Sequence, residues 1–498
     1  MVRLEPLWQG LFALMNAVTF GYIALGVLIG IIVGLIPGVS SVVAIAIILP
    51  FIWGGDPVNS SVILLSLVGA CHCSNTFPAV FFNVPGSPSA SATILDGYPM
   101  ARKGEAARAL SAAFVVSAMG GIFGAVFLAG TIPVMRPLVL KFASPEVFML
   151  IMLGIVMIGT VSGANPVKGI LAGTIGLFVS LIGMDPQLGI PRYALGQAYL
   201  LYGLSLVPLI MGLFALPQVI DLAVKGRIAD VAPERKAKTD IPGLKQGIRD
   251  AFHHWPIVLR SSAIGVVGGA IPGLGGTAAA FYAYAYTLRA ARDKKHFGSG
   301  DVRGVIAPES ANNATQGGEL IPTLAFGIPG SPVAAILLAA FLVLGIIPGP
   351  ELLTTRLTLT FSLIWSLVIA NLLASAICLA LALRATWITW VRGNLLIPFI
   401  LLFILVGSYL THVTLADLVV TLVFGVVGYV MMEYRWPRVP LLIGFVLGGR
   451  AENSLYISIN THGPLFFVRP IALVMLLLLI ATVVFGLRRR KESEGNET

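Results

Sequence analysis

The sequence predicts an all-α polytopic membrane protein, with about twelve membrane elements arranged as two inverted-topology repeats with broken or re-entrant helices. Three observations predict this fold: a high apolar content, long apolar runs from end to end, and a duplicated pair of Pro-Gly motifs. Apolar residues make up 57% of the 498 residues, and charged residues only 11%. A soluble chain carries roughly twice that share of charged residues.

The apolar runs recur along the whole chain, and each approaches the length that crosses ~30 Å of hydrocarbon. The longest polar stretch, residues 221–250, is too short to form a hydrophobic core of its own, so no soluble catalytic domain is expected. The N-terminus lacks a cleavable signal pattern, and we expect its first apolar segment to be a retained helix. Clear apolar runs are residues 11–35, 146–161, 166–183, 196–221, 357–383, 395–411, 414–432 and 469–487.

The net charge of +10 is distributed as in a membrane protein. Basic residues gather in short loops and in the tail that begins at Arg488, a pattern typical of cytoplasmic segments. We therefore expect no nucleic-acid partner. We expect a multi-pass protein of the cell inner membrane with a cytoplasmic C-terminus.

Two different motifs occur twice and in the same order, which indicates a duplication. Pro37-Gly38 is echoed by Pro272-Gly273, and Pro85-Gly86 by Pro329-Gly330. The offsets are 235 and 244 residues. Two unrelated kinks are the alternative, but they would not explain the shared order and the similar offsets.

The charges of the loops orient the two repeats. In repeat one the loop between the motifs, 54–60, has no basic residue, whereas the loop after the second motif, 102–108, is basic. In repeat two this reverses: the loop 289–303 is basic and the loop 345–351 is not. If basic loops face the cytoplasm, the repeats are inverted. The expected parts are repeat one at 1–221, a basic cytoplasmic linker at 222–250, repeat two with the C-terminal helices at 251–487, and a cytoplasmic tail at 488–498.

The Pro-Gly motifs are expected to break helices inside the membrane, because proline lacks an N–H group and glycine tolerates the bend. The apolar stretch from Val39 to Leu49, which is expected to end before Pro50, is too short to span the bilayer and predicts a half-helix or a re-entrant arm. Ser87-Pro88 and Ser331-Pro332 each predict a helix start, since serine favours the N-cap and proline the first turn. Helix starts attract anions, carboxylates among them.

Four such breaks would converge near the midplane and hold a small organic anion between them. The alternative is that these small residues only permit close helix packing. The candidate substrate-binding residues are Pro37, Gly38, Ser40, Ser41, Asn83, Pro85, Gly86, Ser87, Ser89, Thr93, Pro272, Gly273, Gly275, Gly276, Thr277, Gly327, Pro329, Gly330 and Ser331.

A polar segment at 308–323 leads directly into the second motif of repeat two. Carboxylate and amide oxygens suit a cation, and an intramembrane carboxylate suggests a proton relay. The candidates for the coupling ion, Na⁺ or H⁺, are Glu309, Asn312, Asn313 and Thr323. A surface loop is the alternative.

Other residues have simpler interpretations. Asp96 is expected in a turn at the cytoplasmic mouth, with a substrate role as the alternative. Cys71-His72-Cys73 lacks the further ligands of a zinc site, so no metal site is expected. His253-His254-Trp255 predicts an interfacial anchor. Arg260 is either a snorkelling charge or a counter-ion for the substrate.

These motifs resemble the large membrane subunit of the tripartite tricarboxylate transporter family. Beyond residue 355 only the apolar pattern is similar. The matching segments are Gly34–Pro50, Asn83–Thr93, Asp96–Leu110, Gly268–Thr277, Ala307–Asn313, Ile321–Ser331 and Pro348–Pro350.

The resemblance implies a secondary transporter that imports a carboxylate on an ion gradient. It also implies a small membrane subunit and an extracytoplasmic solute-binding protein as partners, besides the lipid bilayer. One segment departs from the family, which usually has a glycine-rich tract of the type Tyr-Tyr-Gly-Gly where this chain has Ala70–Pro78. The wall there becomes bulkier and more polar, so citrate is not assumed as the substrate.

Two other functional classes compete. An ATP-driven permease would need a separate ATPase, because the chain has no Walker motif. A membrane-embedded enzyme would need clustered acids or a zinc-binding pair, and neither D-x-x-D nor H-E-x-x-H occurs. We therefore expect no enzyme activity, no catalytic residue and no cofactor other than the coupling ion.

Overall fold

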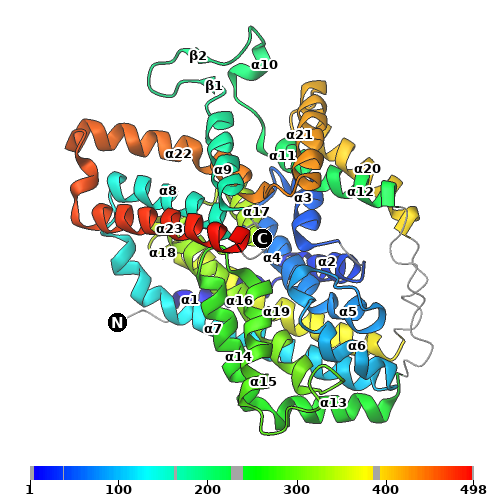
Figure 1. Cartoon of the computed structure of the whole chain (residues 1–498). Coiled ribbons are helices and arrows are strands. Elements are labelled where there is room, and N and C mark those ends of the chain that lie inside the picture. The colour runs from blue at the N-terminus through cyan, green and yellow to red at the C-terminus, as the bar shows by residue number, and fades with distance from the viewer. Residues whose placement is uncertain (1–4, 37–38, 162–164, 226–238, 385–392, 496–498) are drawn as a thin grey trace.

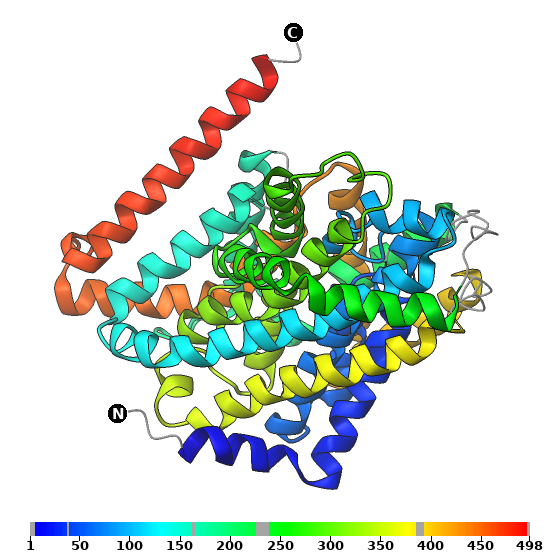
Figure 2. The same ribbon diagram turned by 90° about the horizontal axis from the view of Figure 1, so that it is seen from below.

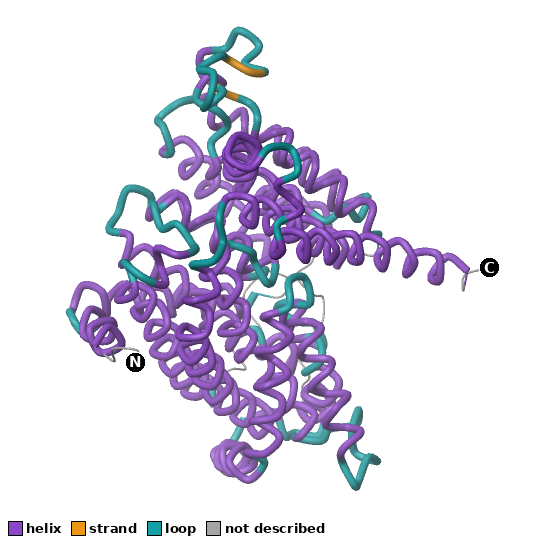
Figure 3. The backbone as a smooth tube through the Cα atoms, turned by 90° about the vertical axis from the view of Figure 1, so that its left-hand side faces the viewer, coloured by secondary structure: helices purple, strands orange, loops and turns teal. Residues whose placement is uncertain are grey.

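The structure is a computed structural model that describes residues 5–36, 39–161, 165–225, 239–384 and 393–495. Within these ranges nearly all regular structure is helical, and the strands are β1 (Gly183–Met184) and β2 (Pro191–Arg192). The two strands form a small antiparallel hairpin in which Gly183 pairs with Arg192. This hairpin projects from the helical body (Figures 1 and 3).

The first half of the chain contains long helices that alternate with short ones. In the region 206–225, a single π-helical turn, η2, interrupts an otherwise α-helical stretch. The helices are α1 (Glu5–Leu14), α2 (Ala17–Gly34), α3 (Ser41–Ile52), α4 (Pro57–Ser74), α5 (Thr76–Phe82), η1 (Pro88–Ala90), α6 (Ile94–Arg102), α7 (Ala106–Val139), α8 (Ser144–Val161), α9 (Pro166–Ser180), α10 (Ala198–Leu201), α11 (Leu206–Ile210), η2 (Met211–Ala215) and α12 (Leu216–Lys225).

The second half repeats this mixture and ends in a long helix, α23, that leaves the body (Figure 3). Its elements are α13 (Ile241–His253), α14 (Trp255–Ala270), α15 (Gly275–Ala290), α16 (Arg303–Phe326), α17 (Pro332–Val343), α18 (Pro350–Leu353), α19 (Leu357–Ala382), α20 (Gly393–Leu410), α21 (Leu415–Glu433), α22 (Arg438–His462), η4 (Phe466–Val468) and α23 (Pro470–Gly495).

Several helices begin at a polar cap followed by proline, as the sequence chemistry favours. Asp56 accepts a hydrogen bond from Asn59 N before Pro57 opens α4. Asn165 caps α9 in the same way. These caps satisfy backbone N–H groups that would otherwise lack partners.

Five helical segments are long and apolar enough to cross a membrane among the described residues, and eight further apolar helices are shorter. Helices α3, α9, α14 and α17 have only 12, 15, 16 and 12 residues, and such short apolar helices are what broken membrane elements would give. The five long segments are Ala17–Gly34, Pro57–Phe82, Ala106–Val139, Leu357–Ala382 and Leu415–Glu433.

Helices from the two halves interleave at the centre. In the first half α4 packs against α2, and it also packs against α19 of the second half. In the second half α16 packs against α14, and it also packs against α7 of the first half. Figure 2 shows α7 and α19 running alongside each other. The core therefore joins both halves rather than separating them.

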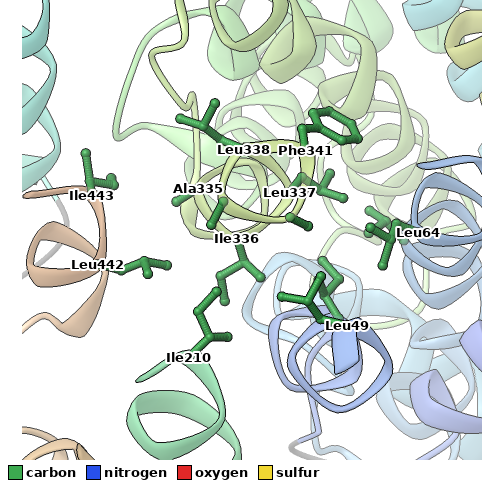
Figure 4. Packing of buried hydrophobic residues seen from close by; sticks show 14 of the residues in the cluster. Leu49, Leu64, Ile210, Ala335, Ile336, Leu337, Leu338, Phe341, Leu442 and Ile443 are labelled. Carbon is green, nitrogen blue, oxygen red and sulfur yellow. The ribbon is translucent and has the colours of Figure 1, made fainter. Parts of the chain in front are cut away.

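The half-helix predicted after Pro37-Gly38 is present as α3, which has 12 residues. It begins at Ser41 and continues through Pro50 to Ile52, so Pro50 does not end it. Helix α17 is also 12 residues long, and it is surrounded by buried side chains (Figure 4). The residues packed around it include Leu49, Leu64, Ile210, Leu442 and Ile443.

Glycines bring helix backbones into direct contact at related positions in both halves. A Cβ atom at Gly30 would collide with the carbonyl oxygen of Leu67, and one at Gly265 with that of Ala311. The glycines are 235 positions apart and their partners 244, the same offsets that separate the motifs. The packing of α2 on α4 is thus repeated by α14 on α16.

Candidate functional site

The site is centred on α16, whose residues from Gly304 to Ala325 are all buried. The segment 308–323 is therefore a buried helix, and the surface-loop interpretation is wrong. Glu309 is fully buried and accepts hydrogen bonds from Thr93 Oγ1 at 2.6 Å and Ser117 Oγ at 3.4 Å. It makes no ion pair with any described residue. A carboxylate placed this way costs free energy unless a proton or a cation neutralises it.

The second break of repeat one follows the buried α4–α5 segment. Asn83 ends α5 in the left-handed conformation, with φ 57°. Gly86 then passes so close to Asn75 that an added Cβ would lie 2.8 Å from Asn75 Cβ. Asn75 Nδ2 donates to Ser87 Oγ at 2.6 Å, and Ser87 Oγ lies 2.8 Å from Ser89 Oγ. These contacts hold the Pro85-Gly86 break against Asn75, at the junction of α4 and α5.

The expected helix start at Ser87-Pro88 is only partly present. Pro88 opens η1, a single 3-10 turn, and the following α-helix α6 begins at Ile94. The chain therefore makes two short steps where one continuous helix was predicted. Asp96 lies inside α6 rather than in a turn.

The second break of repeat two has the same form. Gly327 ends α16 with φ 69°, and Ser331 caps α17 by accepting a hydrogen bond from Ala334 N at 3.1 Å. The helix start predicted at Ser331-Pro332 is confirmed. Gly273 N donates to Gly330 O at 2.9 Å, so the two motifs of repeat two are in direct contact.

Residues from the two halves of the chain meet beside Asn312. An added Cβ at Gly276 would lie 3.3 Å from Ser89 Cβ and 3.5 Å from Asn312 Oδ1. One at Gly275 would lie 3.5 Å from Ser331 Cβ. The Oδ1 atom of Asn312 is buried without a hydrogen-bond partner. The start of α15 thus lies between the serine of one repeat and the serine of the other.

Paired positions also carry paired polar groups. Gly34 packs on α4, where an added Cβ would lie 3.1 Å from Asn75 N, and Gly269 packs on α16, with a corresponding distance of 2.9 Å to Glu319 N. Asn75 bonds Ser87, and the buried Glu319 interacts with Ser331. In each half of the chain, one buried polar side chain, Asn75 or Glu319, therefore lies against the serine of the second Pro-Gly motif.

The other candidates lie in different surroundings. Asn313 donates to Asn371 Oδ1 at 2.7 Å, and Thr323 donates to the backbone oxygen of Glu319 in its own helix. The side chain of neither residue hydrogen-bonds to the Glu309 carboxylate. Thr277 and Asn83 are exposed, Ser40 is half-buried and Ser41 is buried. Pro85, Pro272 and Pro329 shape the breaks, while Pro37 and Gly38 lie outside the described residues.

Sequence reasoning missed the polar contacts between α4, α16 and α19. Gln316 Nε2 lies 2.7 Å from His72 Nδ1, and Asn371 Nδ2 donates to Gln316 Oε1 at 3.2 Å. Asn312 Nδ2 donates to His72 O at 3.3 Å. The signal that could have found them is the motif offset, since His72 and Gln316 are 244 positions apart.

Asp96 has a structural role near this region. Its carboxylate accepts hydrogen bonds from Tyr284 Oη at 3.0 Å and from Gly300 N and Asp301 N, both at 2.8 Å. It thereby ties α6 to α15 and to the loop before α16. No group of three or more His, Cys, Asp or Glu able to hold a metal occurs in the ranges that the structure covers.

A helical chain with several spanning segments, and with buried helices that break at Pro-Gly motifs, defines a multi-pass membrane protein of the transporter type. A family model described as the tripartite tricarboxylate transporter TctA family matches residues 20–443. The chain therefore belongs to this family, whose members are the large membrane subunit of a tripartite transporter.

Two relatives from Agrobacterium vitis are similar to the chain. The "uncharacterized 52.8 kDa protein in TAR-I ttuC' 3'region" is 30% identical over 95% of this chain and 94% of its own length. The "uncharacterized protein in TAR-II ttuC' 3'region" is 35% identical over 44% of this chain and 92% of its own length. No solved structure matches the chain.

Proposed function

We propose that this subunit imports an organic anion, a tri-, di- or other carboxylate, by secondary active transport coupled to Na⁺ or H⁺. It would work with an extracytoplasmic solute-binding protein and a small membrane subunit, in the cell inner membrane with its C-terminus in the cytoplasm. One observation carries the proposal: Ser89, Gly276 and Ser331 gather beside Asn312, close to buried carboxyl groups that lack a cationic partner.

The donors suit an anion. Serine hydroxyls, the first backbone N–H groups of α15 and the N–H of Val333 at the start of α17 can bind carboxylate oxygens, and helix starts carry partial positive charge. Glycines at 275 and 276 carry no side chain that would cover the backbone at the start of α15. We assign the anion to these groups and to Ser87 and Ser89.

The carboxyl groups suit the coupling ion. Glu309 and Glu319 are both buried on α16, and two negative charges there would repel a carboxylate substrate. Neutralisation by H⁺ or Na⁺ removes that repulsion, so ion and anion would favour each other's binding. Unpartnered oxygens of Asn75 and Asn312 are further candidates for a Na⁺ shell. We assign coupling to Glu309 and Asn312 first.

Inverted repeats are the architecture that we propose for this transport. The matching glycine contacts at Gly30 and Gly265 support it, as do the interleaving of α7 with α16 and of α19 with α4. So do the reversed loop charges. Alternating access would then exchange the roles of the two repeats around one site.

Uptake into proteoliposomes tests the proposal. The chain would be reconstituted with its partner subunits and offered mono-, di- and tricarboxylates under an imposed Na⁺ or H⁺ gradient, without ATP. We expect uptake of at least one carboxylate that collapses when the gradient is dissipated. Uptake that required ATP instead would favour the ATP-driven permease, and no gradient-driven uptake of any carboxylate would overturn the proposal.

A further inference from the structure

A cavity of about 300 Å³ lies at the surface between the start of α14 and the end of α15, away from the Pro-Gly breaks. Basic and aromatic side chains line it, and none of its lining residues is Asp or Glu. The polar lining consists of His254, Arg260, Tyr286, Thr287, Arg292 and Arg303. The composition indicates a site for an anion.

Two of the three arginines have uncompensated charges. Arg303 pairs with Asp301, with Nη2 2.6 Å from Oδ2. Arg260 and Arg292 make no hydrogen bond or ion pair with the residues that the structure describes. A guanidinium group donates to two oxygens at once and matches phosphate geometry better than lysine does. An anion in this cavity would therefore meet two free guanidinium groups.

The rest of the cavity is apolar and continues into a wider apolar surface. Ile257, Ala290 and Ala291 complete its lining. Large exposed apolar side chains continue away from it: Leu259 and Val267 on α14, Ile271 directly after α14, and Phe281 and Tyr282 on α15. Trp255 and Tyr286 are also exposed, at the helix ends beside the arginines, where aromatic residues mark a membrane interface.

Arg260 does not serve the buried site. Ser261, Gly265 and Gly269 form the face of α14 that packs toward α16, and all three are buried, whereas Arg260 is exposed. The counter-ion interpretation of Arg260 therefore fails in this conformation. Its side chain lines the surface cavity instead.

We propose that this cavity binds the phosphate headgroup of an acidic phospholipid, whose acyl chains lie along the apolar faces of α14 and α15. The phosphate group supplies oxygens that accept hydrogen bonds from Arg260 and Arg292. The acyl chains of the lipid cover the exposed apolar side chains of α14 and α15, which a soluble phosphate would leave uncovered. The basic loops at this end place the lipid in the cytoplasmic leaflet. A bound lipid would fix the ends of the two helices that flank the first motif of repeat two.

The test uses the full-length protein purified in a neutral detergent and titrated with phosphatidylglycerol, phosphatidylcholine, glycerol 3-phosphate or inorganic phosphate. Native mass spectrometry would measure the bound fraction. We expect Arg260→Gln and Arg292→Gln each to weaken phosphatidylglycerol binding about fivefold, which corresponds to about 1 kcal/mol per basic residue. Arg289→Gln is the matched control, because Arg289 is an exposed arginine of α15 that does not line the cavity.

The outcomes separate the possibilities. If Arg289→Gln lost as much phosphatidylglycerol binding as the two cavity variants, the effect would be one of general charge, and the site would be overturned. Phosphatidylcholine that bound as tightly as phosphatidylglycerol would overturn it too. Glycerol 3-phosphate or inorganic phosphate that binds as tightly as the lipid would assign the cavity to a soluble anion and overturn the lipid proposal. If a glutamine variant does not fold, Arg260→Lys and Arg292→Lys keep the charge but lose the two-pronged contact of the guanidinium group, so we expect weaker phosphatidylglycerol binding than in the native protein, and unchanged binding in both lysine variants would overturn the site.

Discussion

His72 Nδ1 and Gln316 Nε2 lie 2.7 Å apart at the contact between α4 and α16. The two residues are 244 positions apart, which is also the offset between Pro85 and Pro329. A residue thus contacts its own counterpart from the other half of the chain. Such self-pairing is what a two-fold relation between the halves requires along its axis.

This pair should couple measurably. In a double-mutant cycle of His72→Ala and Gln316→Ala, we expect a coupling of ~0.5–3 kcal/mol in the free energy of unfolding, because each change leaves a buried polar partner behind. Denaturant unfolding in detergent would measure it. Additive effects of the two changes would contradict a direct contact. A cycle of His72→Ala with Glu433→Ala, an exposed residue at the end of α21, should be additive.

Glu309→Gln should remove ion coupling while keeping the shape of the side chain. Glutamine still offers an oxygen to Thr93 but cannot take up a proton or balance a cation. We expect ion-driven uptake to be abolished, because the variant has no carboxylate at this position that an ion can neutralise. Proteoliposome uptake at several Na⁺ and H⁺ gradients would measure the change. Wild-type uptake in this variant would remove Glu309 from the mechanism, and Glu433→Gln is the control.

Replacing Gly86 or Gly330 with valine should distort the helix break at that position and weaken substrate binding. The added atoms would meet Asn75 in the first case and the backbone of Gly269 in the second, and backbone cannot move aside cheaply. We expect substrate affinity at least ~10-fold weaker, since each shift moves the neighbouring serine. Gly130→Val is the matched control, because nothing lies within 4 Å of a Cβ there. Normal affinity in both test variants would argue against the site.

Asp96→Ala should destabilise the protein without acting on the substrate. The change leaves Tyr284 Oη and two backbone N–H groups without their acceptor, at a cost of roughly 1–3 kcal/mol for each buried group. Tyr284→Phe removes one of these bonds and should cost ~1 kcal/mol. In thermal unfolding, we expect a lower midpoint temperature for Asp96→Ala than for Tyr284→Phe. Carboxylate affinity measured below the unfolding temperature should stay unchanged, and a loss there would revive a substrate role for Asp96.

Much of the fold could be predicted because it follows from local chemistry. Apolar runs predict the helices, and the Ser331-Pro332 pair predicts the start of α17, since cap and first-turn preferences are properties of a few neighbouring residues. The short α3 was predicted from the apolar run between Pro37 and Pro50. Pro50 inside α3 was harder to interpret, because tertiary packing overrides the local tendency of proline to end a helix.

The site was harder to predict, because its contacts join distant parts of the chain. The sequence shows that 308–323 is polar but not that it forms a fully buried helix, since burial depends on α7, α14 and α4 packing around it. Glu309 could be singled out, whereas its partners Thr93 and Ser117 lie about 200 positions away. The role of Asp96 as an acceptor for the loop at Gly300 likewise needed the three-dimensional arrangement.

Glycine-mediated backbone contact limits how the molecule can move. Gly124 of α7 packs against the carbonyl oxygen of Ala314 in α16, and Gly269 of α14 packs against that of Thr315. If α7 or α14 slid along α16, their main chains would collide with it. In a second group of packed helices, α9 and α22, an added Cβ at Gly176 would likewise collide with the carbonyl oxygen of Leu441. We therefore expect α7, α14 and α16 to move together as one rigid body, and α9 and α22 as another. Any opening of the substrate pathway must then occur between these two groups of helices.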